Sequence, residues 1–200
     1  MEKDSFYLQG TDKEKEKFSG SSGISFEWNI IYSCNYRCPY CIFEGKWEEY
    51  GPRTIVKTVD ELLKIWDRIY DLYGRTSIVF TGGEPTVYPD FFEFISKLSE
   101  KHYPLNISSN GSGDLQKMVK LCDNSKVSMS ISFHPEFDSA ETVRQRAEYL
   151  REKGFLAEFI NLCCYPPYVE KLMDYVKFFK EKGFTVKAIP FCGQYNGKNY

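Results

Sequence analysis

The sequence lacks both a long hydrophobic run and an excess of charge of one sign. No stretch of its 200 residues approaches the roughly 20 apolar residues that a membrane-spanning helix needs, so no membrane partner is predicted. Its 26 basic and 28 acidic residues give a net charge of −2 without a long Lys or Arg run, so we expect no nucleic-acid partner. Residues 1–10 contain no apolar segment typical of a signal peptide, and we expect a cytoplasmic protein.

The sequence also lacks an even number of cysteines, which is typical of secreted proteins held by disulfides. The chain has seven cysteines, and three of them, Cys34, Cys38 and Cys41, fall in one short stretch. Such clustering is typical of thiolates kept reduced for metal binding. Three thiolates from one loop would hold three irons of a four-iron cluster and leave the fourth iron open to a small molecule. A structural zinc site is the alternative, with His134 or Cys192 as its fourth ligand.

The composition predicts one globular domain behind a short leader. Hydrophobic residues make up 42% of the chain, and 16 Phe and 15 Tyr are available to fill a core. Residues 1–23 are charged and then rich in Gly and Ser, so we expect a mobile leader there and a core domain over 24–200. Because the chain stops soon after its last predicted strand, we interpret it as the core of a longer protein, truncated at its C-terminal end, or as a minimal version.

Strand-like and helix-like patterns alternate along the core. Thr58 and Glu61 form a capping-box pattern, which predicts a helix that ends at Gly74. A second helix is expected to begin at Pro89, a residue that suits the first helical position, and to end near Lys101. Further helices are expected after Asp114, after Asp138 or Ser139, and from Val169 to Gly183, and strands over 25–32, 77–80, 105–108, 127–133, 155–163 and 184–191.

This alternation predicts an α/β fold with a parallel sheet and right-handed crossovers. The unusual residues of the chain fall at or just after the ends of the predicted strands. In parallel α/β folds these strand ends share one face, and that face hosts the active site. The residues that we expect to converge there are Cys34, Gly82 to Glu84, Asn110, His134, Cys163, Cys164 and Cys192.

The pattern Cys34-x3-Cys38-x2-Cys41, followed at the second strand by Thr81-Gly82-Gly83-Glu84-Pro85, resembles the radical S-adenosylmethionine (radical SAM) superfamily. The resemblance covers residues 24 to about 193 and implies a TIM-barrel-like partial parallel (β/α)6 barrel. It implies that the three cysteines ligate a [4Fe-4S] cluster whose open iron binds the amino and carboxylate groups of S-adenosylmethionine. Such an enzyme reductively cleaves S-adenosylmethionine to a 5′-deoxyadenosyl radical, which abstracts hydrogen from the substrate.

The resemblance also implies contacts to S-adenosylmethionine. Tyr40 matches the position that lies against the adenine, and Gly82, Gly83 and Glu84 match the stretch that receives the methionine amino group. Glycine permits close backbone approach to a ligand, and a carboxylate is the natural acceptor for an ammonium group. Asn110 resembles the asparagine of a Thr-Asn-Gly turn in relatives and is expected near the cofactor.

A serine and an arginine complete the implied cofactor contacts. Ser132 and Arg144 resemble the pair that contacts the ribose and carboxylate of the cofactor in related maturases. Ser130 and Arg146 lie two residues away and stay open as alternatives. The usual Ser-Leu-Asp is replaced here by Ser132-Phe133-His134, so the resemblance does not assign the neighbouring substrate contacts.

Other candidates have structural interpretations beside the functional ones. Cys122 falls on an apolar helix face and is interpreted as a small hydrophobic side chain. Cys163, Cys164 and Cys192 either pack in the interior, face the substrate or approach an auxiliary cluster. His134 is either a proton donor or substrate contact, or a strand-ending histidine held by a backbone partner.

The substrate is interpreted as a peptide or a small molecule. Relatives with the Gly-Gly-Glu-Pro and Asn-Gly patterns act on peptides, on nucleosides or on small metabolites, so an enzyme that modifies nucleosides or nucleobases is the alternative. A non-enzymatic, zinc-stabilised binding module is the alternative from another class. The expected protein partner is an electron donor such as flavodoxin or ferredoxin.

Overall fold

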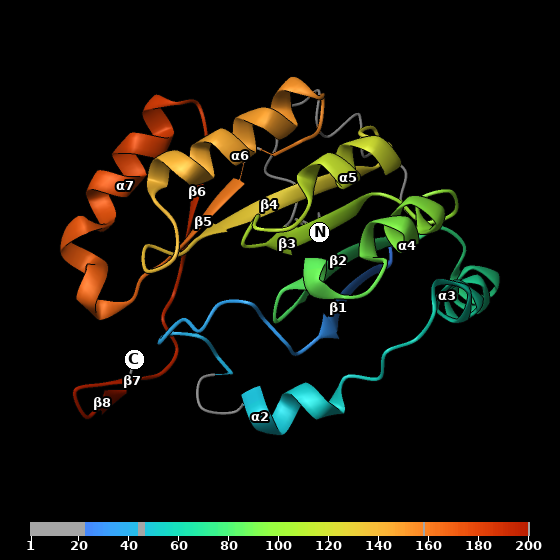
Figure 1. Ribbon diagram of the computed structural model, residues 1–200, viewed down its shortest axis with the longest axis horizontal. Helices are drawn as coiled ribbons and strands as arrows, with labels where there is room; N and C mark the ends of the chain where they lie inside the picture. Colours follow the sequence, from blue (N-terminus) through green and yellow to red (C-terminus); the bar gives the residue numbers. More distant parts are fainter. Residues whose placement is uncertain (1–22, 44–46, 158, 200) are drawn as a thin grey trace, which may run out of the picture.

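Six parallel strands form one sheet in chain order, which confirms the expected α/β partial barrel (Figure 1). The computed structural model describes residues 23–43, 47–157 and 159–199, so nearly all of the expected leader lies outside the described residues. Neighbouring strands pair in order from the first to the sixth. The strands are β1 (Ser25–Ile31), β2 (Ser77–Gly82), β3 (Leu105–Ser109), β4 (Val127–Phe133), β5 (Phe159–Cys163) and β6 (Thr185–Ile189).

Helices in the crossovers cover one side of this sheet. Consecutive long helices pack against one another, and Figure 1 shows them as an arc around the outside of the strands. Sequential strand order with right-handed crossovers requires this one-sided arrangement. No helix in the described part of the chain is both long and apolar enough to cross a membrane. The helices are α2 (Trp47–Tyr50), α3 (Val59–Tyr73), α4 (Phe91–Leu98), α5 (Leu115–Leu121), α6 (Ala140–Glu152) and α7 (Val169–Glu181).

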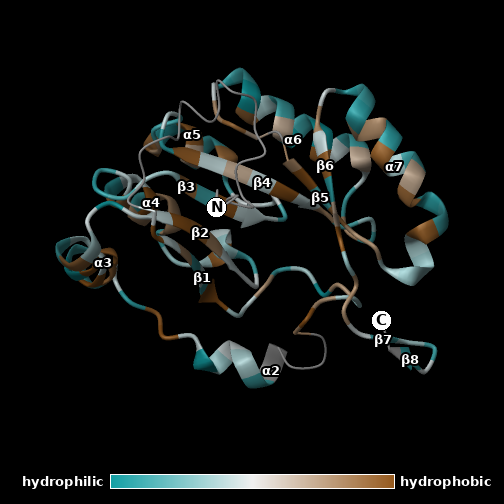
Figure 2. Ribbon diagram, turned by 180° about the vertical axis from the view of Figure 1, so that it is seen from behind, coloured by the Kyte–Doolittle hydropathy of each residue, from teal (hydrophilic) through white to brown (hydrophobic). Residues whose placement is uncertain are grey.

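The strands alternate apolar and polar residues, so the two sides of the sheet differ. Leu105 and Ile107 of β3 are fully buried, and they stand in register with Val127 and Met129 of β4 on the helix side. Figure 2 shows the alternation as hydrophobic and hydrophilic bands along the strands. Because successive side chains point to opposite faces, the intervening residues lie on the inner side of the curved sheet. On β3, β4 and β5 they include the small polar residues Asn106, Ser108, Ser128, Ser130, Ser132 and Asn161. The other strands place Glu27, Val79 and Lys187 on the same side.

Aromatic side chains fill the space between the sheet and the first long helices. The ring of Trp28 in β1 lies 5.5 Å from that of Trp66 in α3 and 5.8 Å from that of Phe80 in β2, measured between centroids. Phe80 in turn packs against Phe94 of α4 at 6.0 Å. Burying one such side chain contributes about 1.5–3 kcal/mol to stability. This packing fixes β1 and β2, whose ends carry the two sequence motifs.

Side-chain caps set the helix boundaries where the sequence predicts them. Thr58 and Glu61 form the reciprocal capping box at the start of α3, as expected. Ser139, and not Asp138, caps α6, because its hydroxyl accepts a hydrogen bond from the backbone N–H of Thr142 at 3.0 Å. Gly154 follows α6 with φ +82°, a left-handed exit that favours glycine.

Several predicted boundaries are wrong, including the start of the fifth strand, which lies at residue 159 and not at 155. The second helix begins at Phe91, and not at Pro89, because Asp90 has φ 51° and a left-handed residue interrupts helical backbone. Pro85 instead opens a short 3-10 turn, η2 (Pro85–Val87). The sixth strand ends at Ile189, before Pro190, which has no N–H to continue a ladder.

A small hairpin follows β6 that the sequence interpretation missed. Strands β7 (Gln194–Tyr195) and β8 (Lys198–Asn199) pair antiparallel across a two-residue turn. Asn196 and Gly197 have φ of 49° and 72°, which is the backbone that a type I′ turn requires. The ring of Tyr195 packs 5.6 Å from that of Tyr165, so the hairpin lies against the end of the barrel that carries the cysteine loop.

Candidate active site

The three clustered cysteines lie in the loop that directly follows β1, where their thiols are near enough to influence one another electrostatically. Cys38 is 7% exposed, and Cys34 and Cys41 are half-buried. Burial raises the pKa of Cys34 and raises that of Cys38 to about 12, and neighbouring thiols of the same group add to both increases. Such mutual electrostatic influence requires short separations.

Backbone amides in this loop point at the sulfur atoms. The N–H of Tyr36 donates to Cys34 Sγ at 3.3 Å, and the N–H of Phe43 donates to Cys41 Sγ at 3.4 Å. Hydrogen bonds to sulfur are among the features that adapt a protein to an anionic iron–sulfur cluster. Three thiols and these donors therefore fit the [4Fe-4S] cluster that the sequence implies.

The Gly-Gly-Glu turn after β2 lies directly against the start of the cysteine loop. The N–H of Gly83 donates to the carbonyl of Ile31 at 2.7 Å, and the N–H of Glu84 donates to the carbonyl of Ser33 at 2.9 Å. A Cβ on Gly82 would overlap the Ile31 oxygen, and one on Gly83 would overlap the Ser33 oxygen. Only glycines permit this approach, so the two sequence motifs meet because of them.

Glu84 is buried and holds the turn in place. Its side chain is 1% exposed, and it accepts hydrogen bonds from the N–H and hydroxyl of Thr86, the hydroxyl of Ser109 and the N–H of Asn110, at 2.6–3.1 Å. A carboxylate offers about four acceptor sites, so protein donors engage them in this structure. The carboxylate thereby ties the end of β2 to the end of β3. Its expected contact with a methionine amino group stays a prediction.

Asn110 connects the end of β3 to the cysteine loop. It is 3% exposed, and its side-chain amide donates to Asn35 Oδ1 at 2.9 Å. Its Oδ1 accepts from the N–H of Ser112 at 2.9 Å, and Asn35 donates to the Ser112 hydroxyl at 2.7 Å. The loop is therefore fixed from both β2 and β3.

Tyr40 forms part of an aromatic wall beside the thiols. Its ring is nearly parallel to that of His134, with centroids 5.8 Å apart, and packs against Tyr165 at 5.1 Å. Its hydroxyl donates to Glu136 Oε2 at 2.9 Å, and Tyr168 donates to the other carboxylate oxygen at 2.7 Å. Burial, with nearby negative groups, raises the pKa of Tyr40. The expected contact of Tyr40 with adenine is untested.

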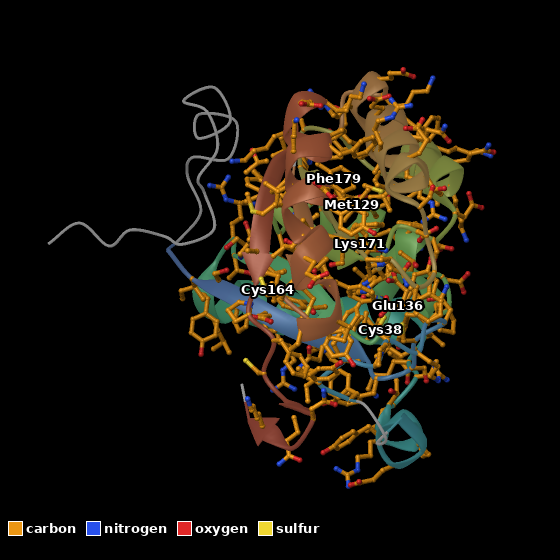
Figure 3. All side chains as sticks on the ribbon, turned by 90° about the vertical axis from the view of Figure 1, so that its left-hand side faces the viewer. Cys38, Met129, Glu136, Cys164, Lys171 and Phe179 are labelled. Carbon is orange, nitrogen blue, oxygen red and sulfur yellow. The ribbon has the colours of Figure 1, made fainter. Side chains whose placement is uncertain are left out.

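His134 ends β4 beside Cys38, and its burial lowers its pKa. Figure 3 shows Cys38 and Glu136 at the same end of the sheet, with Cys164 apart from them. The zinc alternative needs four ligands around one ion. Among the described residues, no three His, Cys, Asp or Glu side chains converge in that way.

The two candidate serines lie on the inner side of the sheet. Ser132 accepts a hydrogen bond from the side-chain amide of Asn161 at 3.4 Å. Ser130 donates to Asn106 Oδ1 at 3.3 Å, and Asn106 donates to Ser128 at 2.9 Å. Both candidates are half-buried, so the geometry keeps both open as cofactor contacts.

The two candidate arginines of α6 lie in different surroundings. Arg144 is ion-paired with two glutamates of its own helix, and the structure does not bring it to the cysteine loop. Arg146 donates to Asp138 at 2.7 Å, and the same carboxylate oxygen accepts from the hydroxyl of Tyr36 at 2.6 Å. Of the two arginines, Arg146 is therefore the one connected to the loop.

The remaining cysteines divide into one core residue and one group near the aromatic wall. Cys122 is 9% exposed within the main core, as its interpretation as a small hydrophobic side chain predicts. Cys163 packs with the aromatic wall, and burial raises its pKa to about 11, with further contributions from Cys164 and Cys192. Within the described part of the chain, none of the seven cysteines forms a disulfide.

Sequence comparisons match this arrangement to a known superfamily. A profile of the Radical SAM superfamily matches residues 28–196. GTP 3',8-cyclase from Staphylococcus carnosus is 27% identical over 192 residues, which cover 86% of this chain and 56% of the cyclase. Mycofactocin maturase MftC from Mycobacterium tuberculosis is 33% identical over 91 residues, 44% of this chain and 21% of the maturase.

Solved structures share the fold. The structure of anSMEcpe with bound AdoMet superposes with a TM-score of 0.69 at 21% identity, covering 87% of this chain and 52% of that one. Streptococcus suis SuiB bound to the precursor peptide SuiA gives a TM-score of 0.62 at 16% identity, covering 84% and 39%. The chain thus spans about half the length of the cyclase and of anSMEcpe. With the profile covering most of its length, the chain belongs to the radical SAM superfamily.

Proposed function

We propose that this protein binds a [4Fe-4S] cluster through Cys34, Cys38 and Cys41 and uses it to cleave S-adenosylmethionine reductively. The superfamily consists of enzymes that use this cluster and this cofactor. When bound, the cluster supplies the electron that breaks the carbon–sulfur bond and yields a 5′-deoxyadenosyl radical. The radical would then abstract hydrogen from a peptide or small-molecule substrate.

One observation carries the proposal: the Gly-Gly-Glu turn lies against the start of the cysteine loop. The N–H groups of Gly83 and Glu84 donate to the carbonyls of Ile31 and Ser33, and Ser33 directly precedes Cys34. A ligand held by the open iron would therefore lie next to the glycine turn. Glycines at such a position allow the backbone to approach that ligand closely.

Named side chains of this chain have supporting roles in the proposal. Glu84 and Asn110 hold the turn and the loop in register through buried hydrogen bonds. Tyr40 supplies an aromatic surface for adenine and, with its neighbours, keeps water from the thiols. Arg146 is the cation beside the loop, and we assign it the contact to the ribose or carboxylate that sequence likeness gives to Arg144.

The substrate class follows from the inner side of the sheet. Small polar side chains of β3, β4 and β5 on this side, such as Asn106, Ser130 and Asn161, offer neutral hydrogen-bond donors and acceptors. A substrate with amide or hydroxyl groups satisfies such a surface, and peptides provide them. SuiB, a structural neighbour, was solved with a precursor peptide, which supports a peptide substrate here.

A nucleotide is the second candidate substrate. The relative whose alignment covers 86% of this chain is a GTP 3',8-cyclase, and a nucleotide also carries hydroxyl and amide groups. We further propose a cytoplasmic location, because the proposed ligands are reduced thiols, and an electron donor of the flavodoxin or ferredoxin type.

Anaerobic reconstitution tests the proposal. We expect about four iron and four sulfide per chain, the content of one cubane. Dithionite and S-adenosylmethionine should then give 5′-deoxyadenosine and methionine in amounts that depend on the cluster. Omission of dithionite is the control that isolates the reductive step.

The contrary result is equally clear. Tight binding of about one zinc per chain, without nucleoside product, would identify a metal-stabilised module instead. Separate incubations with deuterated peptides and with deuterated GTP, each followed by mass spectrometry of the 5′-deoxyadenosine, distinguish the two substrate classes. Deuterium appears in the nucleoside only when the added molecule is the hydrogen donor.

A further inference from the structure

The histidine at the end of β4 contacts a proposed cluster ligand directly. His134 Nδ1 lies 3.3 Å from Cys38 Sγ and 2.9 Å from the hydroxyl oxygen of Tyr40. Cys38 and Tyr40 are 7% and 8% exposed, so water has little access to this contact. Glu136 lies at the same place and is labelled beside Cys38 in Figure 3.

The hydrogen bonds of Glu136 determine which nitrogen of His134 carries the proton. Glu136 accepts from Tyr40 at 2.9 Å and from Tyr168 at 2.7 Å. A carboxylate only accepts, so the single hydroxyl proton of Tyr40 is directed to Glu136. The Tyr40 oxygen then offers only lone pairs to His134. Nδ1 of His134 must therefore carry a hydrogen, and Cys38 Sγ lies within reach of it.

We propose that His134 is a positioning residue that donates its Nδ1–H to the sulfur of Cys38 and thereby raises the reduction potential of the cluster. Reduction makes the cluster more negative, and a donor to its sulfur stabilises that added charge. The same N–H is shared with the oxygen of Tyr40, so the bond to sulfur is only partial. Glu136 is the residue that sets this arrangement, through the direction of the Tyr40 proton.

The test is the midpoint potential of the reconstituted 200-residue chain, measured by redox titration with EPR detection and without S-adenosylmethionine. His134→Leu removes the donor. We expect its reduction equilibrium to weaken about tenfold, a shift of about −59 mV for one electron. His134→Asn keeps an N–H near the position of Nδ1 and should restore most of the wild-type potential.

Tyr40→Phe gives a shift of opposite sign. It keeps the ring but removes the oxygen that competes for the histidine proton, so the N–H turns fully to Cys38. We expect a more positive midpoint potential than in the wild type. The Tyr40 hydroxyl also lies within hydrogen-bond reach of the Cys38 thiol, and a negative shift in Tyr40→Phe would make tyrosine the donor and overturn the proposal.

An unchanged potential in His134→Leu also overturns the proposal. If His134→Leu no longer holds about four irons, two other measurements still test the proposal. They are the sign of the potential shift in Tyr40→Phe and the midpoint potential of His134→Asn. The proposal rests on the proposed function, in which Cys38 is a cluster ligand. If Cys38 is not a ligand, Cys38→Ala will keep its full iron content. If only the role of His134 is wrong, the variants will still carry the cluster but their midpoint potentials will not shift as expected.

Discussion

At the scale of single residues, Gly83 decides how closely the two motifs meet. Its missing side chain leaves room for the carbonyl oxygen of Ser33, which a Cβ would overlap. We expect Gly83→Ala to lower the free energy of unfolding by about 1–3 kcal/mol, as overpacking does, and to reduce the iron content after reconstitution. Gly51→Ala is the matched control, because its Cβ would meet only the Ser33 hydroxyl at 3.6 Å. Equal iron contents in the two variants would contradict this steric account.

Glu84 is a second residue with a structural role, because its buried carboxylate accepts hydrogen bonds that hold the turn after β2. Glu84→Gln keeps the shape but replaces an accepting oxygen by a donating NH₂, which leaves buried donors on Ser109, Thr86 or Asn110 without an acceptor. We expect a loss of about 1–3 kcal/mol in urea unfolding. Glu93→Gln alters an exposed ion pair with Lys97 and should change stability by less than about 1 kcal/mol. Comparable losses in both variants would refute the role of Glu84.

Residue types and strand ends predict the location of the candidate site, but they do not predict its side-chain partners. Arg144 and Arg146 are two positions apart, which places them on different faces of α6, and the sequence does not say which face meets the loop. The contact between Tyr40 and His134 joins residues 94 positions apart. Such a pairing depends on how the loops after β1 and β4 meet at the end of the barrel, so no local pattern encodes it.

At the scale of elements, local chemistry predicts where most strands and helices begin. The capping box at Thr58 sets the start of α3, and alternating Ser and apolar residues set β4 at its predicted bounds. The predicted start of the second helix is wrong because Asp90 adopts a left-handed backbone, which helix propensity and the position of Pro89 do not predict. The last hairpin has a local signal in the sequence, Asn196-Gly197, which is typical of a two-residue hairpin turn.

His102 connects three elements and makes the fold sensitive to pH. It is 1% exposed, bonds through Nε2 to the carbonyl of Trp66 in α3 at 3.1 Å, and lies 2.8 Å from the Thr76 hydroxyl before β2. Burial lowers its pKa below the ordinary value of 6.5. A proton therefore binds the unfolded chain more readily. The stability that neutral His102 provides is complete above pH 6.5 and is lost as the pH falls below that value.

We expect wild-type protein to lose free energy of unfolding between pH 7.5 and pH 5.5, as measured by urea titration. Burial also lowers the pKa of His134, so that residue contributes in the same direction. His102→Gln retains a donor toward Trp66 without the titration and isolates the first contribution. Its stability should fall less steeply over this range. Parallel slopes for the two proteins would show that His102 is not the source.

At the scale of the whole molecule, strand order explains why a site in one place could be predicted from distant residues. Parallel strands in chain order place the loops after β1, β2, β3 and β4 at one end of the barrel. The candidate thiols, the glycine turn, Asn110 and His134 meet there for that reason. The exact position of each loop relative to the others depends on side-chain packing, which the sequence alone does not predict.

The molecule also separates its folding core from its candidate cluster loop. Cys38 packs in a small group with Tyr40 and Phe191, whereas Cys122 belongs to the main core between sheet and helices. We expect Cys38→Ala to abolish cluster assembly and to leave the cluster-free protein as stable as the wild type without cluster. Cys122→Ala should keep about four irons and lose about 1 kcal/mol of stability, because it leaves a small cavity.

Iron analysis after reconstitution and urea unfolding of the cluster-free proteins measure the two effects separately. A crossed result, with iron lost in one variant and stability lost in the other, follows only if the sheet and its helices fold without the loop's metal. Zinc fingers behave differently, because their fold depends on the metal itself. Loss of cooperative unfolding in cluster-free Cys38→Ala would show that the loop is part of the folding core, and the separation inferred from the packing would then be wrong.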